Sequence, residues 1–310
     1  MRESKTIDLR KSWRELPFGS ASAFLSPAAH QVLAALAARL QGAEIPEASI
    51  EARVLVMHAT GWSRTQLLST LREGLPDAAL AVLEGAVTRR LSREPLAYIT
   101  GHREFFGLDI LVDKRVLVPR QETECLVEQV IAIATKHYAG SVTIADVGTG
   151  SGAIAVALAT ALPASRVYAT DASAAALDVA RENVRRHALE RLVSLLHGDL
   201  IAPLPSRVDI MVANLPYIPV GEWEGLQPEI RLYEPRDAVL GGVQGLDCVM
   251  RLLEQVQVMK ERPAWIALEL GEGQAGAVSH IARDLFPSLS TAVFRDLGGL
   301  ERGVLLHLGA

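Results

Sequence analysis

The chain has 310 residues, of which 49 % are hydrophobic, and a formal net charge of −5 at pH 7. This length allows two domains with a sizeable core, and the negative balance gives no reason to expect binding to a nucleic-acid backbone, which needs clustered Lys and Arg. No apolar run approaches the roughly 20 residues that span a membrane. The two cysteines, Cys125 and Cys248, lack metal-binding spacing, so no metal site is expected.

Residues 1–26 show no sustained periodicity, and we expect them to form a loosely held tail. No apolar segment follows their charged residues, so we expect no signal peptide. A chain with only two cysteines also fits a reducing compartment. These features predict a cytoplasmic protein with no membrane partner.

Residues 27–92 have the periodicity of amphipathic helices, interrupted by glycine and proline. The apolar stripes are Val32, Leu33, Leu36, Ala37 and Leu40; Ile50, Val54 and Met57; and Leu80, Leu83, Val87 and Leu91. The segment contains no constellation of chemically reactive side chains. It is either a packing domain or a surface that holds a protein substrate, and we assign it as a helical substrate-docking domain.

Residues 93–120 are expected to form a β-hairpin linker. Residues 105–112 and 116–118 alternate in character on either side of a short turn, which is the pattern of paired strands. Of the adjacent Phe105 and Phe106, one is expected in the hairpin core, and the other is a candidate to close over a bound ligand.

A helix is expected to begin just after this linker. Thr123 is a candidate N-cap, because its hydroxyl can accept from a free backbone N–H of the first turn. Arg120 and Glu122 lie beside it in the sequence. They either form a surface ion pair or contact a ligand directly, and the sequence leaves both alternatives open.

The segment 146–152, Asp-Val-Gly-Thr-Gly-Ser-Gly, lies between an apolar strand-like run and an apolar helical run. It therefore predicts a strand, a glycine turn and a helix. Gly148 and Gly150 permit backbone angles closed to other residues and let a ligand approach the main chain. The next predicted strand ends at Asp171, 21 residues after Gly150, where a carboxylate can bind both ribose hydroxyls of an adenosine.

Two cofactors are compatible with this turn. With Ala153 as the third small residue, the run satisfies the G-x-G-x-x-A pattern of dinucleotide sites, so NAD is a rival. Asp146, in contrast, would place a carboxylate near a positively charged methionine end, and Gly152 gives the spacing G-x-G-x-G. These features favour S-adenosylmethionine.

A second motif, Asn214-Leu215-Pro216-Tyr217, follows the apolar run 208–212, which predicts a buried parallel strand. Ligands of open α/β sheets bind at the carboxyl ends of such strands. Asn214 offers both a donor and an acceptor, Pro216 fixes the backbone, and Tyr217 supplies a flat face. The motif predicts a site for an amide or an exocyclic amine, although an ordinary strand-to-loop turn has the same pattern.

Further strands of the sheet are predicted at 193–196 and 264–270. The runs 291–294 and 304–308 are expected to pair as a closing hairpin.

The two motifs together resemble class I methyltransferases that modify amide or amino nitrogen. Longer segments narrow the resemblance to the release factor glutamine methyltransferase family, and it covers roughly residues 27–310. These segments are 94–108, 116–120 with 122–124, 233–242, 245–247, and 296–299 with Arg302.

The chain departs from the family pattern at two positions. Leu215 and Gln121 each stand where the family usually has proline. Asn-Leu-Pro-Tyr also occurs in ribosomal RNA adenine dimethyltransferases, so an adenine N6-methyltransferase acting on RNA or DNA stays an alternative. A non-catalytic S-adenosylmethionine-binding module that docks a translation factor is another.

The resemblance implies an α/β fold: a Rossmann-like class I methyltransferase sheet in residues 121–310, preceded by the helical bundle and the hairpin linker. It implies S-adenosylmethionine as cofactor and peptide chain release factors as the protein partner, with no direct nucleic-acid contact. The methyl acceptor would be N5 of the glutamine in the Gly-Gly-Gln motif. Asp199 and Leu200 would border the adenine.

The site residues follow from these expectations. The Asn214 side-chain oxygen and the Pro216 carbonyl would both accept from the substrate NH₂, which orients it and favours charge building on its nitrogen. The candidate catalytic residues are Asn214, Pro216 and Tyr217, and Leu215 joins them in the substrate-binding set. The candidate cofactor-binding residues are Asp146, Gly148, Thr149, Gly150, Ser151, Gly152, Asp171, Asp199, Leu200 and Asn214.

Overall fold

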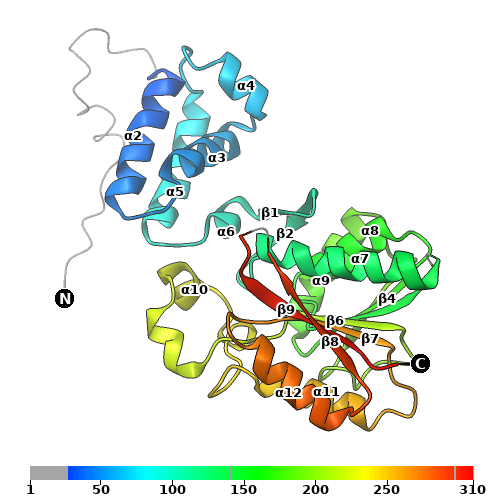
Figure 1. Ribbon diagram of the computed structural model, residues 1–310. Helices are drawn as coiled ribbons and strands as arrows, with labels where there is room; N and C mark the ends of the chain where they lie inside the picture. The colour runs from blue at the N-terminus through cyan, green and yellow to red at the C-terminus, as the bar shows by residue number, and fades with distance from the viewer. Residues whose placement is uncertain (1–26, 140, 297, 310) are drawn as a thin grey trace. The chain divides into compact units, whose positions relative to one another are not determined.

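The computed structural model describes residues 27–139, 141–296 and 298–309 (Figure 1). The chain divides into two compact units, of which one ends at Thr100 and the other begins at Gly101. The expected tail, residues 1–26, lies outside the described residues, as does Leu297 in the family-like segment 296–299.

The first unit is helical, and its helices follow the predicted apolar stripes. They are α2 (Ala29–Gly42), α3 (Ala48–Thr60), α4 (Arg64–Ser69), α5 (Asp77–Leu91) and α6 (Leu96–Thr100). Leu36 of α2 and Leu83 of α5 are fully buried in one core. Of the stripe predicted for α3, Met57 packs against this core, but the prediction for Ile50 was wrong. Ile50 is 52 % exposed, because the inward face of that helix carries Ala52, Leu55 and Val56.

The second unit starts with a β-hairpin whose predicted turn was wrong. Strands β1 (His102–Phe105) and β2 (Leu108–Leu111) pair antiparallel, with Phe105 opposite Leu108. The connecting Phe106 and Gly107 have φ angles of 52° and 72°. Positive φ at both central residues is typical of a type I′ turn, whose twist matches that of paired strands. The hairpin therefore ends before residues 113–120, which follow it as a loop.

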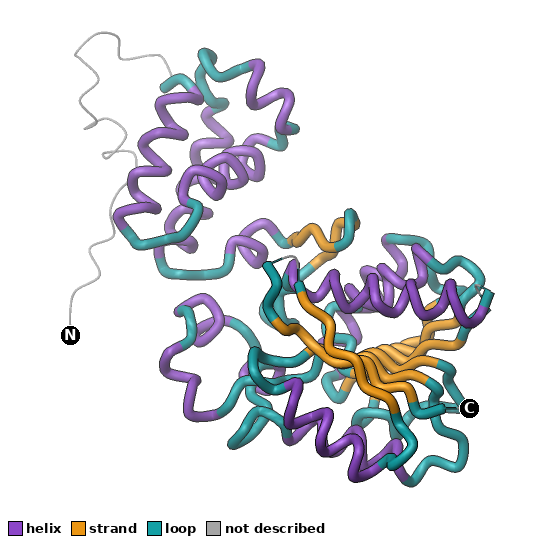
Figure 2. Tube along the Cα trace, in the orientation of Figure 1, coloured by secondary structure: helices purple, strands orange, loops and turns teal. Residues whose placement is uncertain are grey.

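Seven strands of the described chain form the main sheet, in the order β5-β4-β3-β6-β7-β9-β8 (Figure 2). Strands β3 to β7 run parallel, whereas β9 pairs antiparallel with both β7 and β8. The strands are β3 (Thr143–Val147), β4 (Arg166–Asp171), β5 (Val193–His197), β6 (Ile210–Ala213), β7 (Trp265–Glu269), β8 (Ser290–Arg295) and β9 (Glu301–His307). The predicted strands and the closing hairpin are confirmed.

Helices cover both faces of this sheet. Figure 1 shows α7, α8 and α9 on one face and α11 and α12 on the other. Their bounds are α7 (Glu124–Tyr138), α8 (Ala153–Ala161), α9 (Ala174–Arg186), α11 (Asp247–Gln257) and α12 (Ala275–Leu285). Central strands such as β6 are buried on both faces, which explains why they are continuous apolar runs.

Four short elements complete the unit. They are the 3-10 turns η1 (Gln121–Thr123), η2 (Val220–Gly225) and η3 (Arg236–Ala238), and the helix α10 (Pro228–Tyr233). The last three lie in the connection between β6 and α11, which also carries the family-like segment 233–242. None of the helices in the described ranges combines the length and apolar character needed to cross a lipid bilayer.

Candidate functional site

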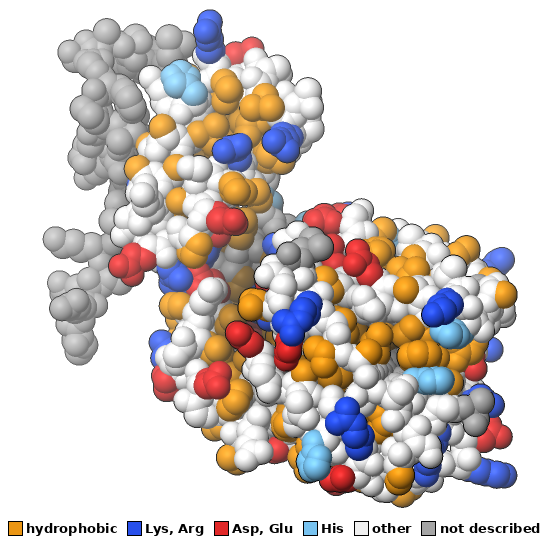
Figure 3. Space-filling view, in the orientation of Figure 1, with side chains coloured by type: hydrophobic (Ala, Val, Ile, Leu, Met, Phe, Trp, Pro, Cys, Tyr) orange, Lys and Arg blue, Asp and Glu red, His pale blue; other side chains and the backbone are white. Residues whose placement is uncertain are grey.

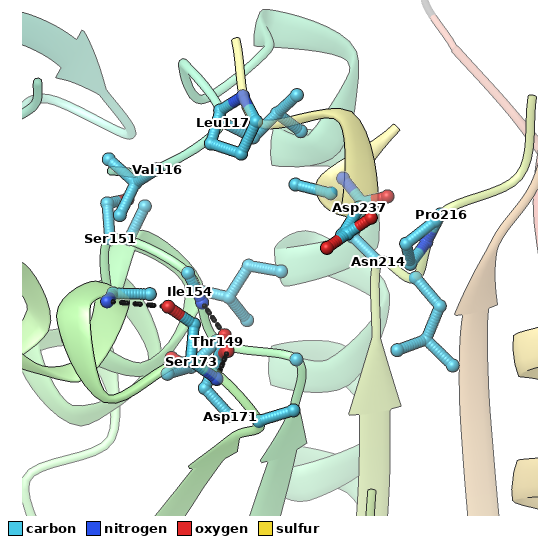
Figure 4. Close-up of a pocket in the computed structure, with 18 of the residues that line it drawn as sticks. Val116, Leu117, Thr149, Ser151, Ile154, Asp171, Ser173, Asn214, Pro216 and Asp237 are labelled. Carbon is cyan, nitrogen blue, oxygen red and sulfur yellow. Dashed lines mark hydrogen bonds between the residues drawn. The ribbon is translucent and has the colours of Figure 1, made fainter. Parts of the chain in front are cut away.

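The candidate site lies where the strand order reverses. From the central β3 the chain continues to β4 and β5 on one side, and later to β6 and β7 on the other. Ligands of open α/β sheets bind at this switch point, outside the carboxyl ends of the strands. A cavity of about 560 Å³ lies there, lined by the turns that follow β3, β4, β5 and β6 (Figure 4). This volume is in the range of cofactor sites.

The glycine turn after β3 has the backbone that its sequence predicts. Gly148, Gly150 and Gly152 have φ angles of 77°, 56° and 81°. A Cβ at Gly150 would meet nothing within 4 Å, whereas one at Gly152 would lie 3.1 Å from the Cβ of Ala180 in α9. Gly150 therefore leaves the main chain open to a ligand, and Gly152 allows α8 to pack closely on α9.

The turn contributes part of the cavity wall. Its lining residues are Gly148, Thr149, Gly150 and Ser151, whereas Gly152 lies outside the lining.

Asp146 supports the glycine turn from beneath. The residue is fully buried and outside the cavity lining, although we expected its carboxylate near the methionine end of the cofactor. Its Oδ2 accepts from Thr149 Oγ1 at 2.6 Å and from the Ala155 backbone N at 3.1 Å. Burial raises the pKa of Asp146 to about 7, although both hydrogen bonds favour the ionised form. In this arrangement the carboxyl group fixes the turn.

Asp171 lies at the end of β4 and lines the cavity. Its Oδ2 accepts from the backbone N of Gly150, and its Oδ1 accepts from the backbone N of Ser173, each at 2.8 Å. A carboxylate has about four acceptor positions. The two that remain suit the ribose hydroxyls expected here.

Asp199 and Leu200 follow β5 and also line the cavity. Asp199 forms an ion pair of 2.6 Å with Arg251, and both side chains are about half exposed. Leu200 is 9 % exposed and has a φ of 47°. Asp199 and Leu200 therefore present one acidic and one apolar group to the cavity, as a site for a purine requires.

Asn214 follows β6, and Figure 4 shows it with Pro216 and Asp237 across the cavity from Asp171. Its Nδ2 donates to Thr123 Oγ1 at 3.1 Å. The predicted N-cap role of Thr123 was wrong, because no side-chain hydrogen bond caps α7 and the Thr123 hydroxyl instead contacts Asn214.

The other residues of this motif differ in exposure to the cavity. Leu215 and Pro216 line it, and Leu215 packs so closely that a Cβ at Gly148 would lie 2.9 Å from its Cδ2. Tyr217 does not line the cavity. Burial, together with the nearby Glu269 carboxylate, raises the pKa of Tyr217 to about 12.

Phe105, rather than Phe106, lines the cavity. Phe105 is fully buried, whereas Phe106 lies in the hairpin turn and its backbone N donates to the Glu124 side chain. The two roles that we divided between these residues thus meet in Phe105, which is both a core residue and part of the cavity wall.

Sequence reasoning missed two buried glutamates. Glu269, the last residue of β7, is 3 % exposed, and its Oε2 has no hydrogen-bond partner among the described residues. The Thr123 hydroxyl acts to lower its pKa. Glu234 accepts from Arg120 Nη2 at 2.5 Å, and Arg120 itself lines the cavity. Burial raises the pKa of both glutamates, that of Glu269 to about 7. The position of Glu269 at the carboxyl end of an apolar strand was a signal that could have identified it.

These residues fit S-adenosylmethionine. The cavity has the required volume, the open face at Gly150 allows close approach to the main chain, and Asp171 offers acceptors for a ribose. The residues that would hold the group are the cavity-lining part of the glycine turn, residues 148–151, together with Asp171, Asp199 and Leu200.

Comparison with known proteins places the chain among methyltransferases. Residues 31–101 match the family model of the PrmC N-terminal domain, and residues 123–223 match that of the methyltransferase small domain. A relative from Moorella thermoacetica, named release factor glutamine methyltransferase, is 42 % identical over 89 % of this chain and 97 % of its own. A Geobacter sulfurreducens relative of the same name is 39 % identical over 86 % of this chain and 91 % of its own.

Solved structures share the fold. The crystal structure of the hMettl16 catalytic domain in complex with MAT2A 3'UTR hairpin 6 has a TM-score of 0.55 at 16 % identity, and the match covers 76 % of this chain and 83 % of that one. At this identity the likeness shows the fold alone. Together with the matching methyltransferase model, it confirms the predicted class I sheet.

Proposed function

The chain belongs to the release factor glutamine methyltransferase family, and on this basis we propose that it methylates N5 of the glutamine in the Gly-Gly-Gln motif of peptide chain release factors. As a member of that family it is an S-adenosylmethionine-dependent methyltransferase. The observation that carries the proposal is the 42 % identity to a relative of this name over nearly the full length of both chains.

The cavity supports this chemistry through two oxygen acceptors. When bound, S-adenosylmethionine supplies an electrophilic methyl group on a positively charged sulfur. The amide nitrogen of glutamine is a poor nucleophile, because its lone pair is delocalised into the carbonyl. The residues of this chain must therefore orient the NH₂ group and stabilise the charge that builds on it.

Asn214 Oδ1 and the Pro216 carbonyl are the acceptors that we assign to this task. Both residues line the cavity. Within the described part of the chain, neither oxygen receives a hydrogen bond from a protein donor. An NH₂ group has two hydrogens to donate, so the pair of oxygens matches it.

The proposal is tested by methyl transfer from labelled S-adenosylmethionine. Purified release factor, the same factor with alanine in place of the Gly-Gly-Gln glutamine, and adenine-containing RNA are offered in parallel. We expect label on the intact factor only. With Asn214→Ala, single-turnover transfer should fall by roughly 10²-fold or more, as on loss of one aligned polar group in other active sites.

Two other outcomes would contradict the proposed function, and each would favour one of the alternatives. Label on the RNA would favour the adenine N6-methyltransferase, which Leu215 keeps as an alternative. That alternative has little electrostatic support, because the net charge is −5 and positive and negative side chains are interspersed on the face in Figure 3. Binding of cofactor and factor without any transfer would favour the non-catalytic module.

A further inference from the structure

We infer that Thr123 and Glu269 are positioning residues, which form a hydrogen-bond chain that fixes the side-chain amide of Asn214 with its oxygen toward the methyl acceptor. The inference rests on the proposed function, since it assigns to Asn214 Oδ1 the task of holding the substrate NH₂.

Three elements bring the chain of hydrogen bonds together. Thr123 ends η1, Asn214 follows β6, and Glu269 ends β7. Strands β6 and β7 pair in parallel with Ala213 beside Leu268, so the residues that follow each of these lie side by side. Asn214 Nδ2 donates to Thr123 Oγ1 at 3.1 Å. The Thr123 hydroxyl also acts on Glu269 and lowers the pKa of that carboxyl, as a donor to a carboxylate does. Thr123 and Glu269 are each 3 % exposed, and Thr123 also lines the cavity.

The direction of each bond follows from the groups available. An ionised carboxylate only accepts, and a hydroxyl has a single proton to donate. Thr123 therefore gives its proton to Glu269, and its oxygen is left as an acceptor for Asn214. Only the amide NH₂ can satisfy that acceptor, since a flipped Asn214 would bring two oxygens together. Asn214 Oδ1 is consequently left free for the substrate.

Protonation of Glu269 removes this constraint. A neutral carboxyl can donate to Thr123, whose proton can then point to Asn214 and stabilise the flipped amide. The charged and titratable groups that act on Glu269 are Arg120 just before η1, Glu122 within η1, Tyr217 after β6, and Arg302 of β9. Burial outweighs the two arginines and raises the pKa of Glu269 to about 7. The ordered amide thus predominates above pH 7 and is lost below it.

Single-turnover transfer to intact release factor, measured from pH 5.5 to 9 with saturating cofactor, tests the inference. We expect the parent rate to fall below about pH 7. Thr123→Val, which keeps the shape and removes the hydroxyl, should lower the rate at pH 8 by roughly tenfold or more. In this variant the rate should no longer fall below pH 7, so the acid limb of the pH–rate profile should be absent. Thr123→Ser should recover most of the rate and the acid limb, and Glu269→Gln should lack the acid limb.

Matched controls separate positioning from folding. Thr160→Val removes a hydroxyl that bonds only within α8, to the Val156 carbonyl at 2.8 Å, and should have the parent rate and pH profile. Calorimetry should give every variant the cofactor affinity of the parent. A Thr123→Val protein that binds cofactor normally and keeps the parent rate and acid limb would overturn the inference.

A second measurement is independent of the methyl acceptor. In ¹⁵N-labelled protein, the side-chain NH₂ signals of Asn214, identified by their loss in Asn214→Ala, should shift with an apparent pKa near 7 in the parent and in Thr123→Ser. They should not titrate in Thr123→Val. If the parent fails to methylate release factor, the proposed function is wrong, yet this titration still decides the hydrogen-bond chain: signals that titrate equally in Thr123→Val refute it.

Discussion

At the scale of single residues, Asp171 combines a structural and a ligand-binding role. Its two oxygens hold the backbone N of Gly150 and of Ser173, and the residue lines the cavity. Asp171→Ala should weaken S-adenosylmethionine binding by roughly 1.5–3 kcal/mol, because a charged acceptor is lost. Asp171→Asn keeps one oxygen for Gly150 and should lose less.

Isothermal calorimetry of cofactor binding measures this difference. Asp178→Asn is the matched control, because Asp178 is exposed on α9 and outside the cavity lining. Equal affinities for the parent and Asp171→Ala would contradict the assigned role, as would a preference of the parent for NAD.

Asp146 makes the stability of the fold depend on pH. Its pKa is raised from 3.8 to about 7 by burial, so between these values the folded protein holds a proton that the unfolded chain has released. Stability from this group is therefore lost as pH rises from about 4 to 7. The side chain of Asp146→Asn cannot titrate. The Tm of this variant, taken relative to that of the parent, should therefore increase as pH rises from about 4 to 7 and stay constant above pH 7.

Thermal melts at half-unit pH intervals, without cofactor, measure the difference. A pKa raised from 3.8 to about 7 corresponds to roughly 4 kcal/mol, at about 1.4 kcal/mol per pKa unit. A total increase of roughly 10 °C is therefore expected, at about 2–4 °C per kcal/mol in domains of moderate size. A difference in Tm that is the same at pH 4.5 and pH 8 would show that Asp146 has no raised pKa in the folded protein.

At the scale of elements, the glycines after η3 shape the Asn214–Tyr217 turn. A Cβ at Gly241 would lie 2.3 Å from the Pro216 carbonyl oxygen, and one at Gly245 would lie 2.1 Å from that of Tyr217. Gly241→Ala must displace the backbone that presents the proposed acceptor. We expect single-turnover transfer to fall by roughly 10²-fold, as for a reacting group misplaced by about 1 Å, with cofactor affinity near the parent value.

Gly276→Ala is the control for this substitution. Gly276 lies in α12 with open space where its Cβ would be, and alanine there should be neutral or stabilising by up to about 1 kcal/mol. If Gly241→Ala and Gly276→Ala transfer methyl at the same rate, the position of the Pro216 carbonyl does not matter for the reaction.

Local patterns also explain which elements could be predicted. The glycine turn and the closing hairpin follow from apolar runs bounded by glycine, because those signals lie within one short segment. The turn of the first hairpin was predicted at the wrong place, because the alternation of apolar and polar residues extends on both sides of Phe106. Only the backbone angles show that the turn is at Phe106 and Gly107. The hydrogen bond between Asn214 and Thr123, and the position of Glu269 on the strand beside that of Asn214, depend on how distant segments meet. No local pattern in any one segment contains that information.

At the scale of the whole molecule, the residues that line the cavity and those that form the helical unit occupy separate parts of the sequence. Every residue that lines the cavity lies between Phe105 and Arg251, within the second unit. The helices of the first unit bury their own apolar core. We therefore propose that the second unit binds cofactor and glutamine and that the first unit docks the protein substrate.

A chain that begins at Gly101 tests this division. It should bind S-adenosylmethionine like the full chain and methylate a short Gly-Gly-Gln peptide at a similar rate, because the cavity keeps all its lining residues. Its kcat/KM for intact release factor should fall by roughly tenfold for each 1.4 kcal/mol of docking energy removed. The peptide serves as the internal control, since it is too short to reach a second surface. An equal loss on both substrates, in a truncated protein that still binds cofactor, would show that the helical unit supports the reaction itself and not the docking of the factor.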